Sequence, residues 1–405
     1  MPEEIVELRG HLIDSLILPK VLDAILRHKA CYAIQQFKVG IRPQDPSLAR
    51  ILIAHKDPKR LEAVLRECAR YGAEPVERHE VRLEPARLNG AFPDDFYATT
   101  HLDTFLYLGG RWVPVANPEM DSGILVSKSR TRAETIKMAD VRKGDLIVVG
   151  HEGVRVVHPE YRRGPEDFEF MTSAVSTEKP KGVLIAAVAR WMKEERRARR
   201  PILFVGGPAI VHSGAAPLLE KLIRSGYVQI LFAGNALAAH DVESAMLGTS
   251  LGVSMREGVV TTSGHENHLR AINAIRAAGG IRSAVRKGLL KSGIMHACVT
   301  HGVDFVLAGS IRDDGPLPEV ITDTQAAQRE MRRRCRKTRL AIMVATLLHS
   351  VATCNMLPAR TRVVCADIEP ASVTKLYDRG SMQTIGIVTD VQPFLRELLM
   401  ELEVR

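Results

Sequence analysis

Glycines and polar residues that could bind a nucleotide follow several apolar runs in the second half of this 405-residue chain. The stretch LFAGNALAAHD leaves an apolar run at Gly234-Asn235 and continues in small residues to His240-Asp241, and TRVVCADI ends at Asp367 in a similar way. Glycine lets a backbone approach a ligand closely, N–H groups at a helix N-terminus bind phosphate, and a carboxylate can accept bonds from ribose hydroxyls. Together, five such turns predict a bound dinucleotide that crosses several strands: VGGPAIVHSG, AGNALAAHD, AGSIRDDGPLPEVITD, ADIEPASVTKLYDRGSMQ and TDVQPF.

The usual fingerprints of nucleotide sites are missing from these turns. Gly206-Gly207-Pro208 comes closest to GxGxxG, but Pro208 has no N–H for a phosphate. The phosphate-binding pattern GxxxxGK[ST] is also absent. Any α/β sheet needs Gly, Asn and Asp to turn from strand to helix, so one turn favours no ligand and only the whole set favours a site.

Two histidine-containing segments could carry other chemistry. SGHENHLRAIN contains His265-Glu266 and His268 in the spacing HExH, which is not the HExxH of zinc proteases. We expect a helix start or a polar substrate contact there, and no metal site. MHACVTHG places Cys298 between two histidines, and a buried small cysteine is favoured over a nucleophile.

The elements that must position these turns form a parallel sheet. From about residue 181 to residue 405, short and nearly continuous apolar runs alternate with helical patterns. Such runs are typical of strands buried on both faces, and ligands bind outside the carboxyl ends of these strands. The predicted strands are PILFVGG, VQILFAGN, DFVLAGS, TRVVCADI and TIGIVTD.

Two smaller units are predicted before this α/β domain. Residues 1–85 follow the order strand-helix-strand-strand-helix-strand of a ferredoxin-like α+β domain, with AEPVERHEVRLEPA as the last strand. Asp57 is expected to cap the second helix, which starts at Pro58 and closes at Gly72. Residues 86–180 are rich in glycine, proline and short alternating segments, which predicts a β-rich domain, with a barrel as one form.

Composition and charge limit the classes of protein to which this chain can belong. The apolar share of 45% is enough for a full core. The sequence contains no run of eighteen apolar residues, so no transmembrane helix is expected. The N-terminus is acidic, unlike a secretory signal, and the six scattered cysteines form no CxxC, which favours a reducing cytoplasm. Much of the net charge of +9 lies in RWMKEERRARR and REMRRRCRKTR. No aromatic residues separate these charges, so solvated helix faces are favoured over a nucleic-acid patch, and a subunit interface stays open.

Several motifs resemble those of the NAD-dependent ornithine cyclodeaminases of archaea. The similar segments are AGNALAAHD, GSIRDDGPLPEVITD, ATCNMLPAR and CADIEP. The same module is fused to arginine dihydrolase in cyanobacteria, and the N-terminal unit resembles the conserved region of plant lysine-ketoglutarate reductase/saccharopine dehydrogenase. The resemblance covers nearly the whole chain. It implies a Rossmann-like NAD domain related to deoxyhypusine synthase. It also implies conversion of L-ornithine to L-proline and ammonia by hydride abstraction, imine cyclisation and re-reduction, with NAD recycled.

The resemblance also implies site residues. NAD is expected to contact Asn235, Ala236, Asp314, Asn355, Met356, Leu357, Asp367, Asp390 and Val391. Candidate acid–base groups for the substrate amines are His240, Asp241, Glu266 and Asp314, with further candidates in TSAVSTEKP, and none is assigned as the unique base. His240 and Asp241 could instead cap the following helix.

Other functions remain open at this point. An NAD-dependent amino-acid or saccharopine-type dehydrogenase is the main alternative, and net release of NADH would distinguish it. An NAD-consuming transferase or deacylase and a non-enzymatic ligand sensor are further possibilities. The expected partners are L-ornithine and other copies of the chain in a dimer or tetramer, with no nucleic acid and no membrane. The sequence does not separate ornithine from lysine or diaminobutyrate.

Overall fold

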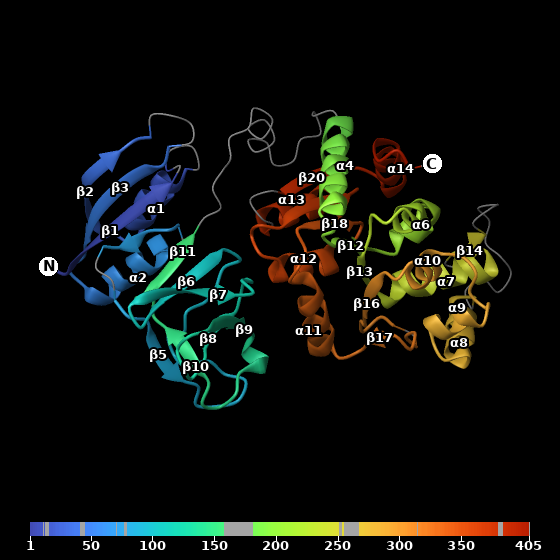
Figure 1. Cartoon of the computed structure of the whole chain (residues 1–405), viewed down its shortest axis with the longest axis horizontal. Coiled ribbons are helices and arrows are strands. Elements are labelled where there is room, and N and C mark those ends of the chain that lie inside the picture. The colour runs from blue at the N-terminus through green and yellow to red at the C-terminus, as the bar shows by residue number, and fades with distance from the viewer. Residues whose placement is uncertain are drawn as a thin grey trace. The chain divides into compact units, whose positions relative to one another are not determined.

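The computed structural model divides the chain into two compact units, Met1–Thr172 and Ser173–Arg405, each of which is described by itself (Figure 1). The structure describes residues 1–10, 12, 16–40, 45–69, 71–76, 79–157, 181–250, 253–254, 267–313, 315–379 and 384–404.

The first sheet of the N-terminal unit has four strands in the order β2-β3-β1-β4, and β1 is antiparallel to both of its neighbours. Its elements are β1 (Glu3–Gly10), α1 (Ile17–Arg27), β2 (Cys31–Lys38), β3 (Ser47–Ala54), α2 (Pro58–Ala69) and β4 (Glu74–Pro75). This order confirms the predicted ferredoxin-like arrangement. The predicted cap is also present, because the backbone N–H of Lys59 donates to Asp57 Oδ1 at 3.0 Å.

The second sheet has seven strands in the order β11-β6-β7-β9-β8-β10-β5. They are β5 (Arg82–Pro85), β6 (Asp103–Leu108), β7 (Arg111–Ala116), β8 (Gly123–Val126), β9 (Ala133–Ile136), β10 (Leu146–Val149) and β11 (Val154–Val157). The prediction of a single strand over residues 73–86 was wrong, because β4 joins the first sheet and β5 pairs with β10 in the second. Alternating apolar residues look the same in either sheet, so the pattern does not reveal this crossing.

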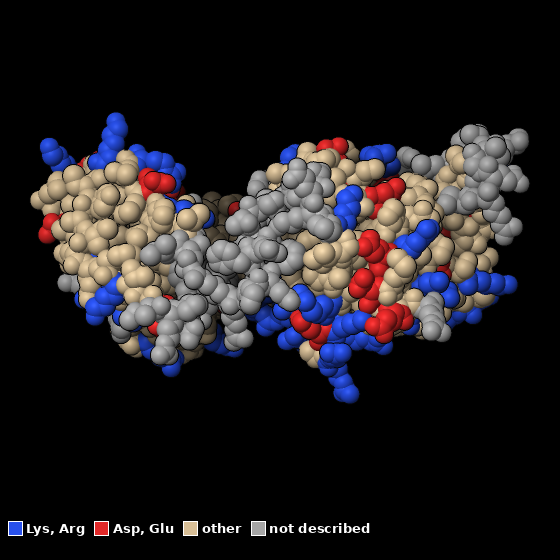
Figure 2. Space-filling view, turned by 90° about the horizontal axis from the view of Figure 1, so that it is seen from above, with Lys and Arg blue, Asp and Glu red and all other residues tan. Residues whose placement is uncertain are grey.

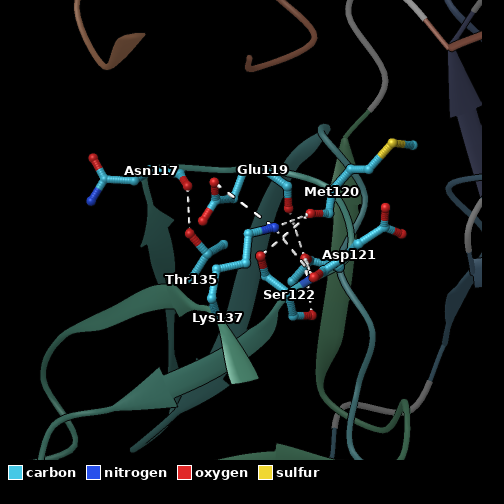
Figure 3. A network of polar contacts seen from close by, with 8 residues as sticks. Asn117, Glu119, Met120, Asp121, Ser122, Thr135 and Lys137 are labelled. Atoms are coloured by element: carbon cyan, nitrogen blue, oxygen red, sulfur yellow. Dashed lines mark hydrogen bonds and ion pairs between the residues drawn. The ribbon is translucent and has the colours of Figure 1, made fainter. Parts of the chain in front are cut away.

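A polar network fixes the loop between β7 and β8 (Figure 3). Lys137 Nζ donates to the carbonyl oxygens of Met120 at 2.6 Å and Asp121 at 3.2 Å, and it lies 4.0 Å from Glu119 Oε2. Glu119 is buried, and the hydroxyl of the buried Thr99 donates to its carbonyl oxygen at 2.7 Å. The ammonium group therefore donates two hydrogen bonds to this loop and lies beside its buried carboxylate.

The C-terminal unit is built on a parallel sheet in the order β17-β16-β13-β12-β18-β19-β20. The strands are β12 (Ile202–Gly206), β13 (Ile230–Gly234), β16 (Asp304–Ala308), β17 (Val320–Ile321), β18 (Leu340–Val344), β19 (Arg362–Asp367) and β20 (Thr384–Val388). All five strands predicted for this region are confirmed. The interior strand β18, whose five residues are all buried, was not predicted.

Helices cover this sheet in two groups. Helix α14 contacts α4 and α6, and α6 contacts α10, while α12 contacts α11 and α13 in a separate row. Right-handed crossovers place these groups on opposite faces, since the strand order reverses between β12 and β18. The helices are α4 (Lys181–Arg197), α5 (Ala209–His212), α6 (Ala216–Arg224), α7 (Asn235–Leu247), α8 (Asn267–Ala278), α9 (Ile281–Arg286), α10 (Ile294–Thr300), α11 (Thr324–Cys335), α12 (Leu347–Met356), α13 (Pro370–Arg379) and α14 (Val391–Glu401). A short hairpin, β14 (Thr249–Ser250) and β15 (Val253–Ser254), follows α7.

Basic residues in the two charge runs form ion pairs. Arg334 pairs with Asp304 at 2.7 Å and also with Glu330, and Arg196 stacks on the ring of Tyr227. Figure 2 shows basic and acidic side chains interspersed over the visible face of the C-terminal unit. These contacts fit the interpretation of the runs as solvated helix faces. Among the helices that the structure describes, none has the length and apolar composition needed to cross a membrane.

Candidate active site

The carboxyl edge of the parallel sheet has its switch point between β12 and β18, where open α/β sheets bind ligands. A hydrogen bond joins the turn after β12 to the end of β18: the backbone N–H of Gly207 donates to the Val344 carbonyl oxygen at 3.0 Å. A Cβ at Gly207 would lie 1.8 Å from the Ala345 carbonyl oxygen, so only glycine fits. The Gly207 N–H is therefore already bonded, which agrees with the missing phosphate-binding fingerprint.

Asn235 and Ala236 begin α7 directly after β13. Asn235 is buried, and its side-chain oxygen accepts a hydrogen bond from the Leu317 N–H at 3.1 Å. This bond ties the end of β13 to the loop after β16. That loop encloses a pocket of about 230 Å³ whose lining includes Gly309 and Asp313. Asp314, the next residue along, lies outside the described residues.

Asp367 and Asp390 follow the neighbouring strands β19 and β20 and reach the same edge. The Asp367 side chain is half-buried and accepts the Glu369 N–H at 2.9 Å. Asp390 is exposed at the start of α14 and makes no capping hydrogen bond, while Val391 is buried beside it. Both carboxylates are thus placed where a ligand at the edge could reach them.

The structure does not bring Asn355, Met356 and Leu357 to this edge. Helix α12 runs from the carboxyl end of β18 back toward the amino end of β19, and these residues lie at its far end. The side chains of Met356 and Leu357 belong to the hydrophobic core. Asn355 Oδ1 is buried with no hydrogen-bond partner in the described part of the chain. Residues 346–349, at the start of α12, occupy the edge instead.

His349 is a residue of this edge that the sequence reasoning missed. Its ring packs over Gly234, where a Cβ would lie 3.0 Å from His349 Cε1 and 3.7 Å from the Ala308 carbonyl oxygen. Its Nδ1 is 3.3 Å from Thr346 Oγ1. Burial lowers the pKa of His349, and the nearby Asp313 carboxylate opposes that shift. A neutral imidazole therefore stands among the turns after β13, β16 and β18.

Large apolar side chains are exposed along the same edge. Ile311 follows β16 and is fully exposed, Leu348 follows β18 with 74% of its surface exposed, and Ile368 follows β19 with 71% exposed. Single exposed apolar residues are common on proteins, but these three all come from turns at one edge of the sheet, where a ligand could cover them.

The predicted His240-Asp241 pair divides into two roles. Asp241 is fully buried and accepts the backbone N–H groups of Ile294 at 2.7 Å and Met295 at 2.8 Å, so it caps α10. Burial raises its pKa to about 7. His240 instead lies within α7, where its Nδ1 is 3.0 Å from Glu243 Oε2. Neither residue caps α7, which begins at Asn235.

The remaining candidates from the sequence are Glu266, the segment TSAVSTEKP and Cys298. Glu266 and the segment TSAVSTEKP lie outside the described residues. Cys298 is fully buried, and this burial raises the pKa of its thiol well above its usual range. A buried and protonated thiol is inert, as the sequence interpretation favoured.

Known protein families match nearly the whole chain in three consecutive segments. Matching family models are the arginine dihydrolase ArgZ-like C-terminal Rossmann fold over residues 186–398, its C-terminal first region over 103–185, and the LOR/SDH bifunctional enzyme conserved region over 3–102. The ornithine cyclodeaminase of Methanocaldococcus jannaschii is 50% identical over 404 residues, which cover 98% of this chain and 96% of that protein. This chain belongs to the ornithine cyclodeaminase family.

Solved structures of related proteins agree with this membership. The apo structure of ArgZ, an arginine dihydrolase from cyanobacteria, is 33% identical with a TM-score of 0.87, and the match covers 99% of this chain and 58% of ArgZ. The ternary complex of AgrE with ornithine and NAD⁺ is 35% identical with a TM-score of 0.54 over 99% of this chain and 57% of AgrE. The resemblance to the cyclodeaminases, and the Rossmann-like class of the C-terminal unit, are thereby confirmed.

Proposed function

We propose that this chain is an NAD-dependent ornithine cyclodeaminase that converts L-ornithine to L-proline and ammonia. Five archaeal relatives that carry the name ornithine cyclodeaminase are 45–51% identical to it over nearly its whole length. AgrE, which shares the fold, forms a complex with ornithine and NAD⁺.

The carboxyl edge of the parallel sheet fits NAD, and this observation carries the proposal. Carboxylates of Asp367 and Asp390 can accept bonds from ribose hydroxyls, and the exposed side chains of Ile311, Leu348 and Ile368 can cover flat rings. When bound, NAD accepts hydride from the ornithine α-carbon and returns it to the cyclised product, so it is recycled.

The residues of the chain hold and orient these molecules. Asn235 and Ala236 present the first turn of α7 at the middle of the edge. Thr346 and His349 extend the same surface from α12, and the neutral imidazole can accept a hydrogen bond or a proton. We retain Glu266 and Asp314 as acid–base candidates because of their residue type and their place in the α/β domain.

Further expectations belong to this proposal. We infer division into domains 1–85, 86–180 and 181–405, which the three consecutive family models support. We also infer a homo-oligomer, a dimer or tetramer, that acts on a small molecule in the cytoplasm.

Incubation of the purified chain with L-ornithine and NAD tests the proposal. Equal amounts of proline and ammonia with no net NADH are expected. Net NADH without proline would replace the proposal with an amino-acid or saccharopine-type dehydrogenase, for which the LOR/SDH match over residues 3–102 is the supporting feature. Assays with lysine and diaminobutyrate in place of ornithine test the choice of substrate.

A further inference from the structure

A buried histidine–glutamate network lies on the two helices that leave the neighbouring strands β12 and β13. Glu243 of α7 is fully buried, and its two carboxylate oxygens contact His240 Nδ1 at 3.0 Å and Thr249 Oγ1 at 2.8 Å. His212, the last residue of α5, packs edge-on against the His240 ring with 4.7 Å between ring centroids, and His268 of α8 follows at 6.2 Å.

The Glu243 carboxylate determines which group donates and which accepts in each hydrogen bond of this network. An ionised carboxylate only accepts hydrogen bonds, so Thr249 must donate its hydroxyl hydrogen to Glu243. The hydroxyl then accepts Asn267 Nδ2 at 2.9 Å. For the same reason His240 Nδ1 carries a hydrogen, and the lone pair of the neutral ring lies on Nε2.

That lone pair is available to a substrate. In the described part of the chain, His240 Nε2 has no hydrogen-bond partner, and the side chain is 12% exposed. Burial and the neighbouring His240 ring lower the pKa of His212, and the Glu243 carboxylate opposes that shift. Within the described residues, no group of three or more His, Cys, Asp or Glu side chains is arranged to hold a metal ion.

The proposed reaction needs a group with these properties. The side-chain amine of ornithine is an ammonium at neutral pH and has no lone pair until it loses a proton. Once it has attacked the α-carbon, the departing α-amino group must gain a proton to leave as ammonia. One base that accepts and then returns a proton serves both steps.

We propose that His240, held by Glu243, accepts the proton of the side-chain ammonium of the diamino-acid substrate and returns it to the departing amino group. This inference rests on the proposed function. After C2 has been oxidised to the imine, the δ-ammonium gives one proton to Nε2 and the freed amine forms its bond to C2. The α-nitrogen gains this proton from Nε2 and a second proton that the δ-nitrogen loses after the attack. The bond between C2 and the α-nitrogen then breaks, which releases ammonia and leaves the protonated cyclic imine. Glu243 is a positioning residue that fixes the tautomer and stabilises the transient imidazolium.

Glu243→Gln in the full chain tests this role, because an amide presents an N–H to His240 and favours the opposite tautomer. We expect kcat for proline formation to fall about 10²- to 10⁴-fold, with a much smaller change in KM for ornithine and no loss of NAD binding. ¹⁵N NMR of the His240 ring should show its hydrogen on Nδ1 in the wild type and on Nε2 in the variant.

His240→Asn should lose as much activity as Glu243→Gln, and the double variant should lose little more, because the pair acts as a unit. His301→Asn, at the residue that follows α10 in the same unit, is the matched control and should keep the wild-type kcat. An unchanged kcat in His240→Asn overturns the inference, including where Glu243→Gln fails to fold. A wild type that makes no proline refutes the proposed function instead. In that case a hydrogen on Nε2 of wild-type His240 would refute the inference separately.

Discussion

Two buried glutamates, one in each unit, have basic partners that are used differently. Glu119 in the N-terminal unit lies 4.0 Å from Lys137 Nζ, and that ammonium also donates to two carbonyl oxygens of the same loop (Figure 3). Glu243 in the C-terminal unit contacts His240 Nδ1, and the opposite ring nitrogen makes no hydrogen bond among the described residues. Both carboxylates are almost inaccessible to solvent.

The difference separates a structural charge from one that is available for chemistry. A buried charge is tolerated only with matched partners, so burial alone identifies no function. Where the partner donates to backbone carbonyl oxygens, as Lys137 does, the pair fixes a loop. Where the partner keeps one free atom, the pair can exchange a proton with a ligand.

The largest effect is expected from Lys137→Met. The change removes the positive charge beside the buried Glu119 carboxylate and the donor to two loop carbonyls. We expect the free energy of unfolding of the N-terminal unit to fall by about 3–5 kcal/mol, measured by chemical denaturation. The variant should keep the wild-type kcat at a temperature where it is folded. Loss of kcat with unchanged stability would break the comparison and place this loop in the active site.

A smaller effect is expected at Asp241, a third buried carboxylate whose partners are both backbone N–H groups. Its pKa is about 7 in the folded chain against an ordinary value of 3.8, so the folded state binds this proton more tightly. The contribution of the group to stability is therefore complete below the lower value and is lost as pH rises toward the higher one.

Asp241→Asn removes this titration. The free energy of unfolding of the wild type, relative to the variant, should fall by roughly 1–3 kcal/mol between about pH 4 and about pH 8, because ionisation of a buried group is opposed in the folded state. Denaturant unfolding of both chains across this range measures the difference. A gap that does not change with pH would show that Asp241 keeps one protonation state throughout.

The sequence predicted most of the parallel sheet, and it failed where a strand lacks a polar ending. Asn235, Asp367 and Asp390 each follow an apolar run, and the structure places all three at the carboxyl edge. Strand β18 follows a basic run and is followed by Ala345-Thr346, with none of the Gly, Asn or Asp residues that mark the other turns. Because β18 was missed, His349 was missed with it.

The histidine–glutamate network could not be predicted from the sequence, for a different reason. On the sequence, Glu243 is an ordinary polar residue of the helix segment HDVESAML. Its role depends on Thr249 in the following hairpin, on Asn267 at the start of α8, and on His212 from the preceding crossover. Such contacts come from the packing of several elements, and the spacing of residues in one element does not encode them.

The smallest effect, and the sharpest test of the carboxyl edge, comes from Leu348→Ser compared with Asn355→Leu. Leu348 is 74% exposed at the start of α12, so its replacement should change stability little but weaken NAD binding about 10-fold, measured by calorimetry, because the cofactor would cover its apolar side chain. Asn355 lies at the far end of the helix with an unbonded buried oxygen. Its replacement by leucine should leave NAD affinity unchanged without loss of stability, since the change removes an unpaired polar atom. The reverse result would move the cofactor to the end of α12 and restore the contact at Asn355 that the sequence resemblance implied.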